Sequence, residues 1–205
     1  MRNIFFTILC VLLFVTPVQA DAAGEVRALL KDKIDAVVVL LQDKGLDKAR
    51  RNEQITDIIA PIFDYKTMAK LSLGKKHWST LSPEQQAEFS DLFIKRLQNS
   101  YLDKLDLFSD EKILYGEPSA KGKKVHMSTT LASKDSRIEM LYKFYRSQKG
   151  WKIYDVEVGG VSVIQTYRSQ FNGVLIEGTV DDLLEKLKTD GVFVIPAPDN
   201  QLGTD

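Results

Sequence analysis

Apolar residues recur every three or four positions in the first part of the chain, the spacing of one face of an α-helix. This pattern predicts a helix over residues 25–43. A second, shorter helix is predicted from Ile55 to Ile62, with a disturbance at Pro61, because proline has no backbone N–H to donate. Each helix has one apolar face, so each is expected to pack on another layer of the protein.

A third, longer helix is expected to begin after Ser82. Ser82 and Gln85 have the spacing of a capping box, and Pro83 suits the first helical position. Apolar side chains then follow at every fourth position, which places them in one stripe. The stripe consists of Phe89, Phe93, Leu97, Tyr101 and Leu105.

The middle of the chain changes to a period of two, which is typical of β-strands. Residues 124–131 alternate in a strand-like pattern, with Val125, Met127, Thr129 and Leu131 on one face. Residues 138–145 and 151–158 alternate with additional apolar side chains on the opposite face. A weaker strand is predicted at 113–115. Short turn-like segments separate these runs, so the pattern predicts an antiparallel meander of four strands.

Helical spacing returns after Gly159-Gly160. One helix is predicted from Val163 to about Leu175, with Ser162 as its N-cap, and a last helix is predicted to begin at the N-cap Thr179. The order of helices, four antiparallel strands and helices again predicts an α+β fold.

Two of the predicted strands are apolar on both faces, which leaves two interpretations open. Either helices pack on both faces of the sheet, or the apolar surfaces line a lipid-sized pocket between the sheet and a single helical layer. Large side chains that could line such a pocket are numerous: Phe89, Phe93, Tyr101, Tyr142, Phe144, Trp151, Tyr154, Tyr167 and Phe171.

The first 20 residues have the features of a cleavable signal peptide. Arg2 precedes an apolar run over residues 4–15, and Val18 and Ala20 supply small side chains before an expected cleavage site after Ala20. A run of 12 residues is shorter than the ~20 that a spanning helix needs. Cys10 lies in the middle of the run, which argues against a lipid-modified cysteine. We therefore expect the protein to be exported.

The remaining chain is expected to form one domain over residues 21–190, followed by a flexible tail over 191–205 that is rich in Pro, Gly and polar residues. The full chain has 28 Lys and Arg against 28 Asp and Glu, so it lacks the basic excess of a nucleic-acid-binding protein. One cysteine and two histidines argue against zinc sites, cysteine nucleophiles and disulfide scaffolds.

Few residues suggest catalysis. No glycine-rich phosphate loop or nucleophile elbow is present in the sequence. The best acid–base candidates are Asp64, Asp155 and Glu157. Asp155 lies within an apolar strand, where burial would raise its pKa, although a structural hydrogen bond is the simpler role. His77 and His126 are interpreted as surface histidines.

Two ordered sets of motifs resemble the MlaC family, also called the toluene-tolerance family. The first set comprises Phe63-Asp64-Tyr65-Lys66-Thr67-Met68-Ala69, Leu73-Gly74-Lys75-Lys76-His77-Trp78 and Ser82-Pro83-Glu84-Gln85-Gln86 through Phe89. The second set comprises Trp151-Lys152-Ile153-Tyr154-Asp155-Val156, Gly160-Val161-Ser162-Val163 and Tyr167-Arg168-Ser169-Gln170-Phe171. The resemblance extends over about Val26 to Lys188. Thr166 departs from the family pattern, where asparagine is expected.

The resemblance implies a periplasmic phospholipid shuttle that is not an enzyme and needs no cofactor beyond its lipid cargo. It implies a helical layer on the four-stranded sheet with acyl chains between them. The implied partners are an inner-membrane ABC transporter complex with an MCE-domain protein and an outer-membrane lipoprotein complex, in a system that supports outer-membrane lipid asymmetry. The protein is expected to be a monomer and to bind no nucleic acid.

The residues expected to contact the lipid lie on the facing surfaces of the long helix, the strands and the helix that follows the sheet. They are Phe93, Leu97, Tyr101, Leu105, Met127, Met140, Tyr142, Phe144, Val156, Val158, Val163, Tyr167 and Phe171.

Three alternatives remain open at this point. The first is a small-molecule enzyme on a cone-shaped α+β fold, with Asp64 or Asp155 as its base. The second is a structural adaptor whose aromatic side chains form a solid core, and the third is a carrier of a sterol-like or hopanoid lipid. A connected cavity would argue against the adaptor, and a carboxylate that points into that cavity would favour the enzyme.

Overall fold

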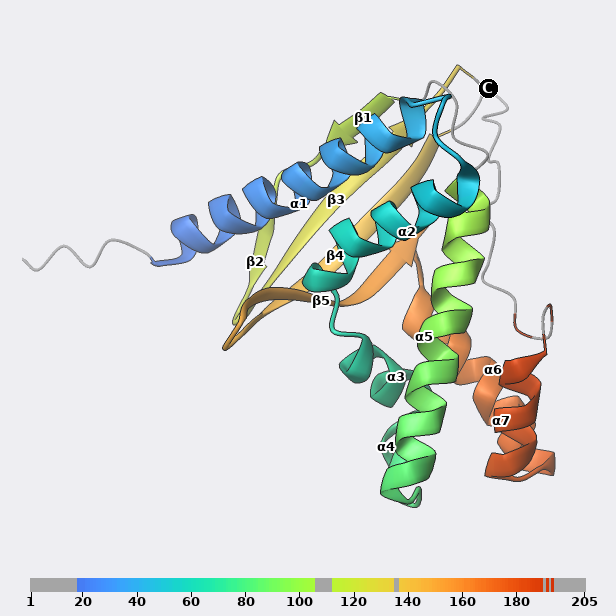
Figure 1. Cartoon of the computed structure of the whole chain (residues 1–205). Helices are drawn as coiled ribbons and strands as arrows, with labels where there is room; N and C mark the ends of the chain where they lie inside the picture. Colours follow the sequence, from blue (N-terminus) through green and yellow to red (C-terminus); the bar gives the residue numbers. More distant parts are fainter. Residues whose placement is uncertain (1–17, 106–111, 135–136, 190, 192, 194–205) are drawn as a thin grey trace, which may run out of the picture.

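The computed structural model describes residues 18–105, 112–134, 137–189, 191 and 193. These residues form an α+β fold in which helices pack on an antiparallel sheet (Figure 1). The fold class predicted from the sequence is therefore confirmed. Nearly all of the expected signal peptide and tail lies outside the described residues, and helix α1 begins at Val18.

The helices before the sheet are α1 (Val18–Gln42), α2 (Lys48–Ile59), the 3₁₀ turn η1 (Ala60–Ile62), α3 (Tyr65–Leu73), α4 (Lys75–Trp78) and α5 (Pro83–Leu105). Helix α2 ends at Ile59, two residues before Pro61. Proline has no backbone N–H to donate to a helical carbonyl, so an end near this position is expected. The capping box of α5 is present: Gln85 N donates to Ser82 Oγ at 3.2 Å, and Ser82 N donates to Gln85 Oε1 at 3.1 Å. Helices α3 and α4 were not predicted.

The strands are β1 (Lys112–Tyr115), β2 (Ser119–Lys121), β3 (Lys124–Ala132), β4 (Arg137–Ser147), β5 (Gly150–Val158) and β6 (Val161–Ser162). They form one antiparallel sheet in the order β1-β3-β4-β5-β6, with β2 also paired to β3. The four predicted strands are present, and the short strands β2 and β6 are additional. Both are two or three residues long, too short for a periodicity of two to be recognised.

Two helices follow the sheet, α6 (Val163–Glu177) and α7 (Val180–Lys188). Their predicted N-caps are confirmed. Gln165 N donates to Ser162 Oγ at 3.1 Å, and Asp182 N donates to Thr179 Oγ1 at 3.2 Å.

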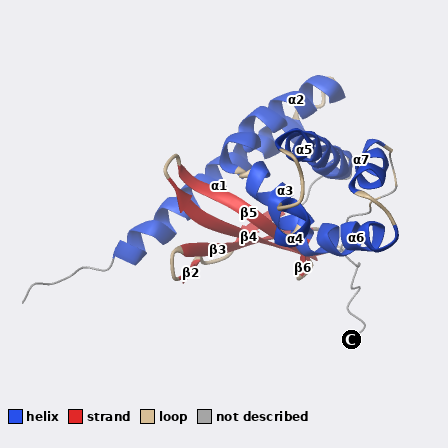
Figure 2. Cartoon of the chain, turned by 90° about the horizontal axis from the view of Figure 1, so that it is seen from below, coloured by secondary structure: helices blue, strands red, loops and turns tan. Residues whose placement is uncertain are grey.

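Helices α1, α2 and the second half of α5 lie on one face of the sheet, whereas α4, α6 and α7 gather beyond its end (Figure 2). The strand register places alternate residues of β3, β4 and β5 on that face, including the paired residues Met127 and Tyr142. Two polar contacts hold α1 there: Glu25 accepts a hydrogen bond from Trp151 Nε1 at 2.7 Å, and Asp35 accepts one from Tyr115 Oη at 2.7 Å. The one-layer arrangement is therefore observed, rather than helices on both faces.

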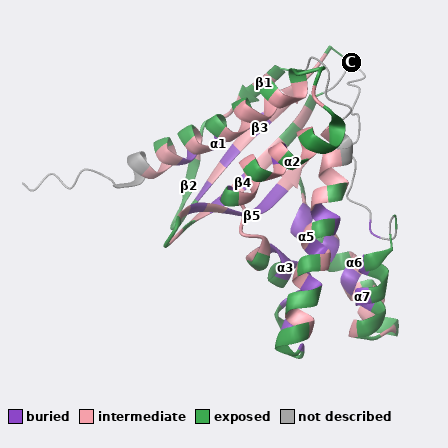
Figure 3. Cartoon of the chain, in the orientation of Figure 1, coloured by how far each residue is buried: buried purple, intermediate pink, exposed green. Residues whose placement is uncertain are grey.

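The other end of the molecule has a solid core where α3, α6 and α7 pack around the first half of α5 (Figure 3). Aromatic rings meet edge to face in this core, with centroids 5.2 Å apart for Phe93 and Tyr167 and 5.5 Å apart for Phe89 and Phe171. Phe193 packs on Phe171 at 5.1 Å. One end of the molecule is therefore a helical bundle with an aromatic core, and the other end is a layer of helices on the sheet.

Candidate functional site

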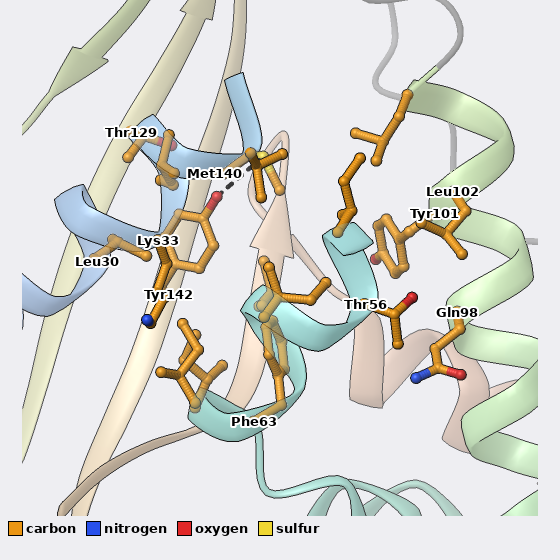
Figure 4. A pocket seen from close by; sticks show the side chains of 18 of the residues that line it. Leu30, Lys33, Thr56, Phe63, Gln98, Tyr101, Leu102, Thr129, Met140 and Tyr142 are labelled. Atoms are coloured by element: carbon orange, nitrogen blue, oxygen red, sulfur yellow. Dashed lines mark hydrogen bonds between the residues drawn. The ribbon is translucent and has the colours of Figure 1, made fainter. Parts of the chain in front are cut away.

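A cavity of about 240 Å³ lies between the sheet and the helices α1, α2 and α5 (Figure 4). Its walls are mostly aliphatic and aromatic. Helix α1 contributes Leu30, Ile34, Val37, Val38 and Leu41, and α2 with η1 contributes Ile55, Ile59 and Ile62. The connected void argues against the adaptor hypothesis, which requires a solid interior.

Seven of the thirteen residues predicted to contact lipid line this cavity. They are Leu97, Tyr101, Leu105, Met140, Tyr142, Val156 and Val163. They come from the second half of α5, from β4 and β5 and from the start of α6. The structure thus brings together side chains that lie up to 66 positions apart in the sequence.

The other six predicted residues lie outside the cavity: Phe93, Met127, Phe144, Val158, Tyr167 and Phe171. Phe93, Tyr167 and Phe171 are fully buried in the aromatic core. Met127 and Phe144 are fully buried between sheet and helices, and Val158 packs against the same core. Five of these six side chains are buried against protein and Val158 is partly buried, so in this structure none of the six lines the cavity.

Helices α1 and α2 form one wall of the cavity, although neither is among the elements predicted to contact lipid. Their apolar faces were interpreted as ordinary packing surfaces, because a helical stripe shows only that one face is buried. The sequence of α1 also contains three consecutive valines, Val37, Val38 and Val39, after Ile34. These β-branched residues have a low helix propensity. Phe63, Tyr65 and Met68 also line the cavity and were not predicted.

Polar groups in the cavity wall are few, and most have partners within the protein. Among the described lining residues, Lys33 alone is charged, and its Nζ lies 3.2 Å from Asp32 Oδ2. Thr56 Oγ1 donates to Asn52 O at 2.9 Å. A wall of this kind suits hydrocarbon and offers little to a polar small molecule.

A second, more open pocket of about 420 Å³ adjoins the first. Phe63 and Tyr65 line both pockets, and their stacked rings, with centroids 5.5 Å apart, form the wall between them. The second pocket is polar, with Asp64, Lys149 and Lys152 in its lining. Its chemistry does not match acyl chains.

The carboxylates considered as catalytic bases do not line the main cavity. Asp155 accepts hydrogen bonds from Lys143 Nζ and from Ser162 Oγ, both at 2.9 Å, and thereby links the sheet to the start of α6. Glu157 Oε1 lies 2.5 Å from the same Lys143 nitrogen. Both carboxylates are thus held by a cation rather than directed at a ligand.

Asp64 caps the start of α3, where Thr67 N donates to its Oδ1 at 3.0 Å. Burial raises the pKa of Asp64, but hydrogen bonds from Tyr145 and Thr67 outweigh this effect and leave the pKa below its usual value. A general base needs a pKa nearer neutrality, so this arrangement is unfavourable for catalysis.

The two histidines are also away from the cavity lining. His126 pairs with Lys143 in the strand register, on the face of the sheet opposite the helices. Burial, followed by the charge of Lys143, lowers the pKa of His126. His77 lies in the short helix α4.

In the part of the chain that the structure describes, no three His, Cys, Asp or Glu side chains gather closely enough to hold a metal ion. No described helix combines the length and the apolar character needed to cross a bilayer.

The sequence of the chain matches the family model of the MlaC protein over residues 31–189. The chain belongs to the MlaC family. The match extends from the cavity-lining half of α1 to the end of α7, so it includes both the cavity and the aromatic core. It confirms the resemblance on which the sequence analysis relied.

The fold of the chain is also similar to that of a solved structure. The chain is similar to the phospholipid-binding protein from Ralstonia solanacearum, determined in complex with a phospholipid, with a TM-score of 0.71 and 25% sequence identity. The alignment covers 79% of this chain and 94% of the other. No match was found among curated proteins. This member of the MlaC family therefore shares its fold with a protein solved with a phospholipid bound.

Proposed function

We propose that the protein binds a phospholipid, with its acyl chains in the cavity between the sheet and α1, α2 and α5, and carries it as a periplasmic shuttle. The cavity is the observation that carries this proposal, because its wall is apolar over almost its whole extent. Membership of the MlaC family and the similarity to a protein solved with a phospholipid support the same ligand class. The role is binding and transport rather than catalysis.

The free energy of burying acyl chains indicates what such a carrier needs. Burying ~30 methylene groups at ~0.8 kcal/mol each is worth roughly 24 kcal/mol relative to water. That exceeds the usual limit of noncovalent affinity, roughly 20 kcal/mol. The same burial exists in a bilayer, however, so the net gain on extraction is close to zero. Docking partners are therefore needed to drive loading and release.

We propose that these partners are an inner-membrane ABC transporter complex with an MCE-domain protein and an outer-membrane lipoprotein complex. In this proposal the protein acts between the two membranes, as a monomer, and supports the lipid asymmetry of the outer membrane. Export through a signal peptide cleaved after Ala20 is part of the proposal. N-terminal sequencing of the native protein should then give Asp21, whereas an intact Met1 or a lipid on Cys10 would contradict export in this form.

Native mass spectrometry of the purified protein, before and after organic extraction, tests the lipid assignment. Protein from a Gram-negative host should carry about one diacyl phospholipid, with zwitterionic and anionic headgroups both represented, because Lys33 is the one charged side chain among the described lining residues. Extraction should remove the added mass. A sterol-like or hopanoid mass would change the ligand class, and a lipid-free mass under gentle ionisation would contradict the proposal.

A further inference from the structure

Three tyrosines line the cavity, and two of them have hydrogen-bond partners. Tyr65 shares a hydrogen bond with Gln98. Tyr142 Oη lies 3.5 Å from Met140 Sδ and also interacts with Thr129. These contacts all lie within the cavity wall, so the two hydroxyl groups are satisfied by the protein itself.

Tyr101 is different, because its hydroxyl oxygen is buried and has no hydrogen-bond partner among the described residues. Burial, the largest effect on this group, raises the pKa of Tyr101, so the hydroxyl keeps its proton and remains a hydrogen-bond donor. Buried hydroxyl groups in native proteins nearly always have a partner. A phenylalanine would fill the same space without this cost, so the hydroxyl calls for a function.

The position of Tyr101 shows where a partner would lie. It is one turn after Leu97 and one turn before Leu105, and both of these leucines line the cavity. Its ring extends from α5 into the cavity, toward the opposite helices (Figure 4). The ring of Tyr101 therefore lies against whatever occupies the cavity, and the occupant is the nearest source of a partner for the hydroxyl.

We propose that the Tyr101 hydroxyl donates a hydrogen bond to an ester carbonyl oxygen of the bound phospholipid. This inference rests on the proposed function. Acyl chains contain no acceptor, and a headgroup phosphate is bound by cations, of which the described lining offers only Lys33 on α1. Ester carbonyls are the acceptors where the acyl chains begin. Tyr101 thus selects lipids with ester linkages over lipids that have the same chains without carbonyl groups.

A competition between two lipids that differ only in the linkage tests this selection. Extracted full-length mature protein is incubated with vesicles of equimolar diacyl and dialkyl phosphatidylcholine of equal chain length, and the bound lipids are compared by mass spectrometry. The wild type should favour the diester by roughly 3- to 10-fold, the effect of one hydrogen bond. Tyr101→Phe should bring the ratio close to one. Tyr154→Phe, a tyrosine outside the cavity lining, should keep the wild-type ratio.

The outcomes separate this inference from the proposed function. If the wild type binds the diacyl and dialkyl lipids in a ratio near one, the proposed role of Tyr101 is overturned without any variant. Binding of both lipids would still support the carrier function. Equal diester preference in the wild type and in Tyr101→Phe also overturns the role of Tyr101. Binding of neither lipid overturns the carrier function together with this inference. Thermal unfolding of extracted protein provides a second readout, since Tyr101→Phe should be at least as stable as the wild type without lipid.

Discussion

Asp155 shows how a single residue that resembles a catalytic group can have a structural role. Its side chain is 8% exposed and joins Lys143 on β4 to Ser162 at the start of α6. Ile164 N also donates to it, at 3.4 Å. The sequence indicated a carboxylate within an apolar strand but could not show its partners, because these come from other elements of the fold.

Replacing Asp155 should therefore destabilise the protein. Asp155→Ala leaves Lys143 and the start of α6 without this carboxylate, and we expect a loss of about 3 kcal/mol in the free energy of unfolding. Urea unfolding measures this loss. Glu157→Ala is the matched control: it removes the other carboxylate on Lys143, but its side chain is 25% exposed, and a loss under about 1 kcal/mol is expected. Similar losses in the two variants would argue against the bridging role.

Asp64 should make stability depend on pH on the acid side. Its pKa is lowered in the folded protein because hydrogen bonds from Tyr145 and Thr67 outweigh the effect of burial. The stabilisation is therefore present above the unfolded pKa and is lost as pH falls through the lower, folded pKa. Asp64→Asn should lose less free energy of unfolding than the wild type between neutral pH and about pH 3. Parallel pH profiles for the two proteins would contradict this prediction.

At the scale of elements, α5 shows the limit of what periodicity can predict. Its stripe from Phe89 to Leu105 is uniform in sequence, yet the first half packs in the aromatic core and the second half lines the cavity. The sequence predicted the helix, its cap and its buried face. It could not predict whether protein or ligand lies opposite each position, because an apolar side chain suits both. For the same reason, Phe93 is predicted to contact lipid but lies in the aromatic core in this structure, and the wall formed by α1 and α2 is not predicted.

The two halves of α5 should respond differently to truncation. Phe93→Ala removes a ring from the solid core and should cost about 3–5 kcal/mol in unfolding of the lipid-free protein. Leu105→Ala lies on the cavity wall, where little packing is lost without a ligand, so a cost below about 2 kcal/mol is expected. Denaturant unfolding after organic extraction compares them. Equal costs would mean that the cavity half of α5 is packed as tightly as the core half.

At the scale of the whole molecule, the aromatic core and the cavity lie in different parts of the fold. Ring contacts in the aromatic core join α5 to α6 away from the cavity, so we expect the fold to persist when the cavity is empty. The resemblance to the MlaC family indicated a helical layer on a sheet with lipid between them. Composition and periodicity alone left a two-sided core as an equal alternative.

Adjacent residues of α1 allow the hollow end to be tested without disturbing the solid end. Val38 lines the cavity, whereas Val39 is 66% exposed. Val38→Arg places a charge in an apolar space and should abolish lipid binding, while Val39→Arg should retain it. Both changes replace valine by arginine in the same helix, so the effect on helix propensity is shared. Leu97→Arg on the opposite wall should reproduce the result of Val38→Arg.

Three measurements decide the outcome: lipid content by mass spectrometry, circular dichroism, and melting before and after extraction. A ligand that binds only the folded state adds about 2.7 kcal/mol at a concentration of 100 Kd, so extraction should lower the Tm of the wild type and of Val39→Arg. Val38→Arg should be folded, lipid-free and unchanged by extraction. If Val38→Arg retains lipid, the cavity is not the binding site. If it loses its fold along with the lipid, α1 belongs to the core rather than to a wall around a ligand.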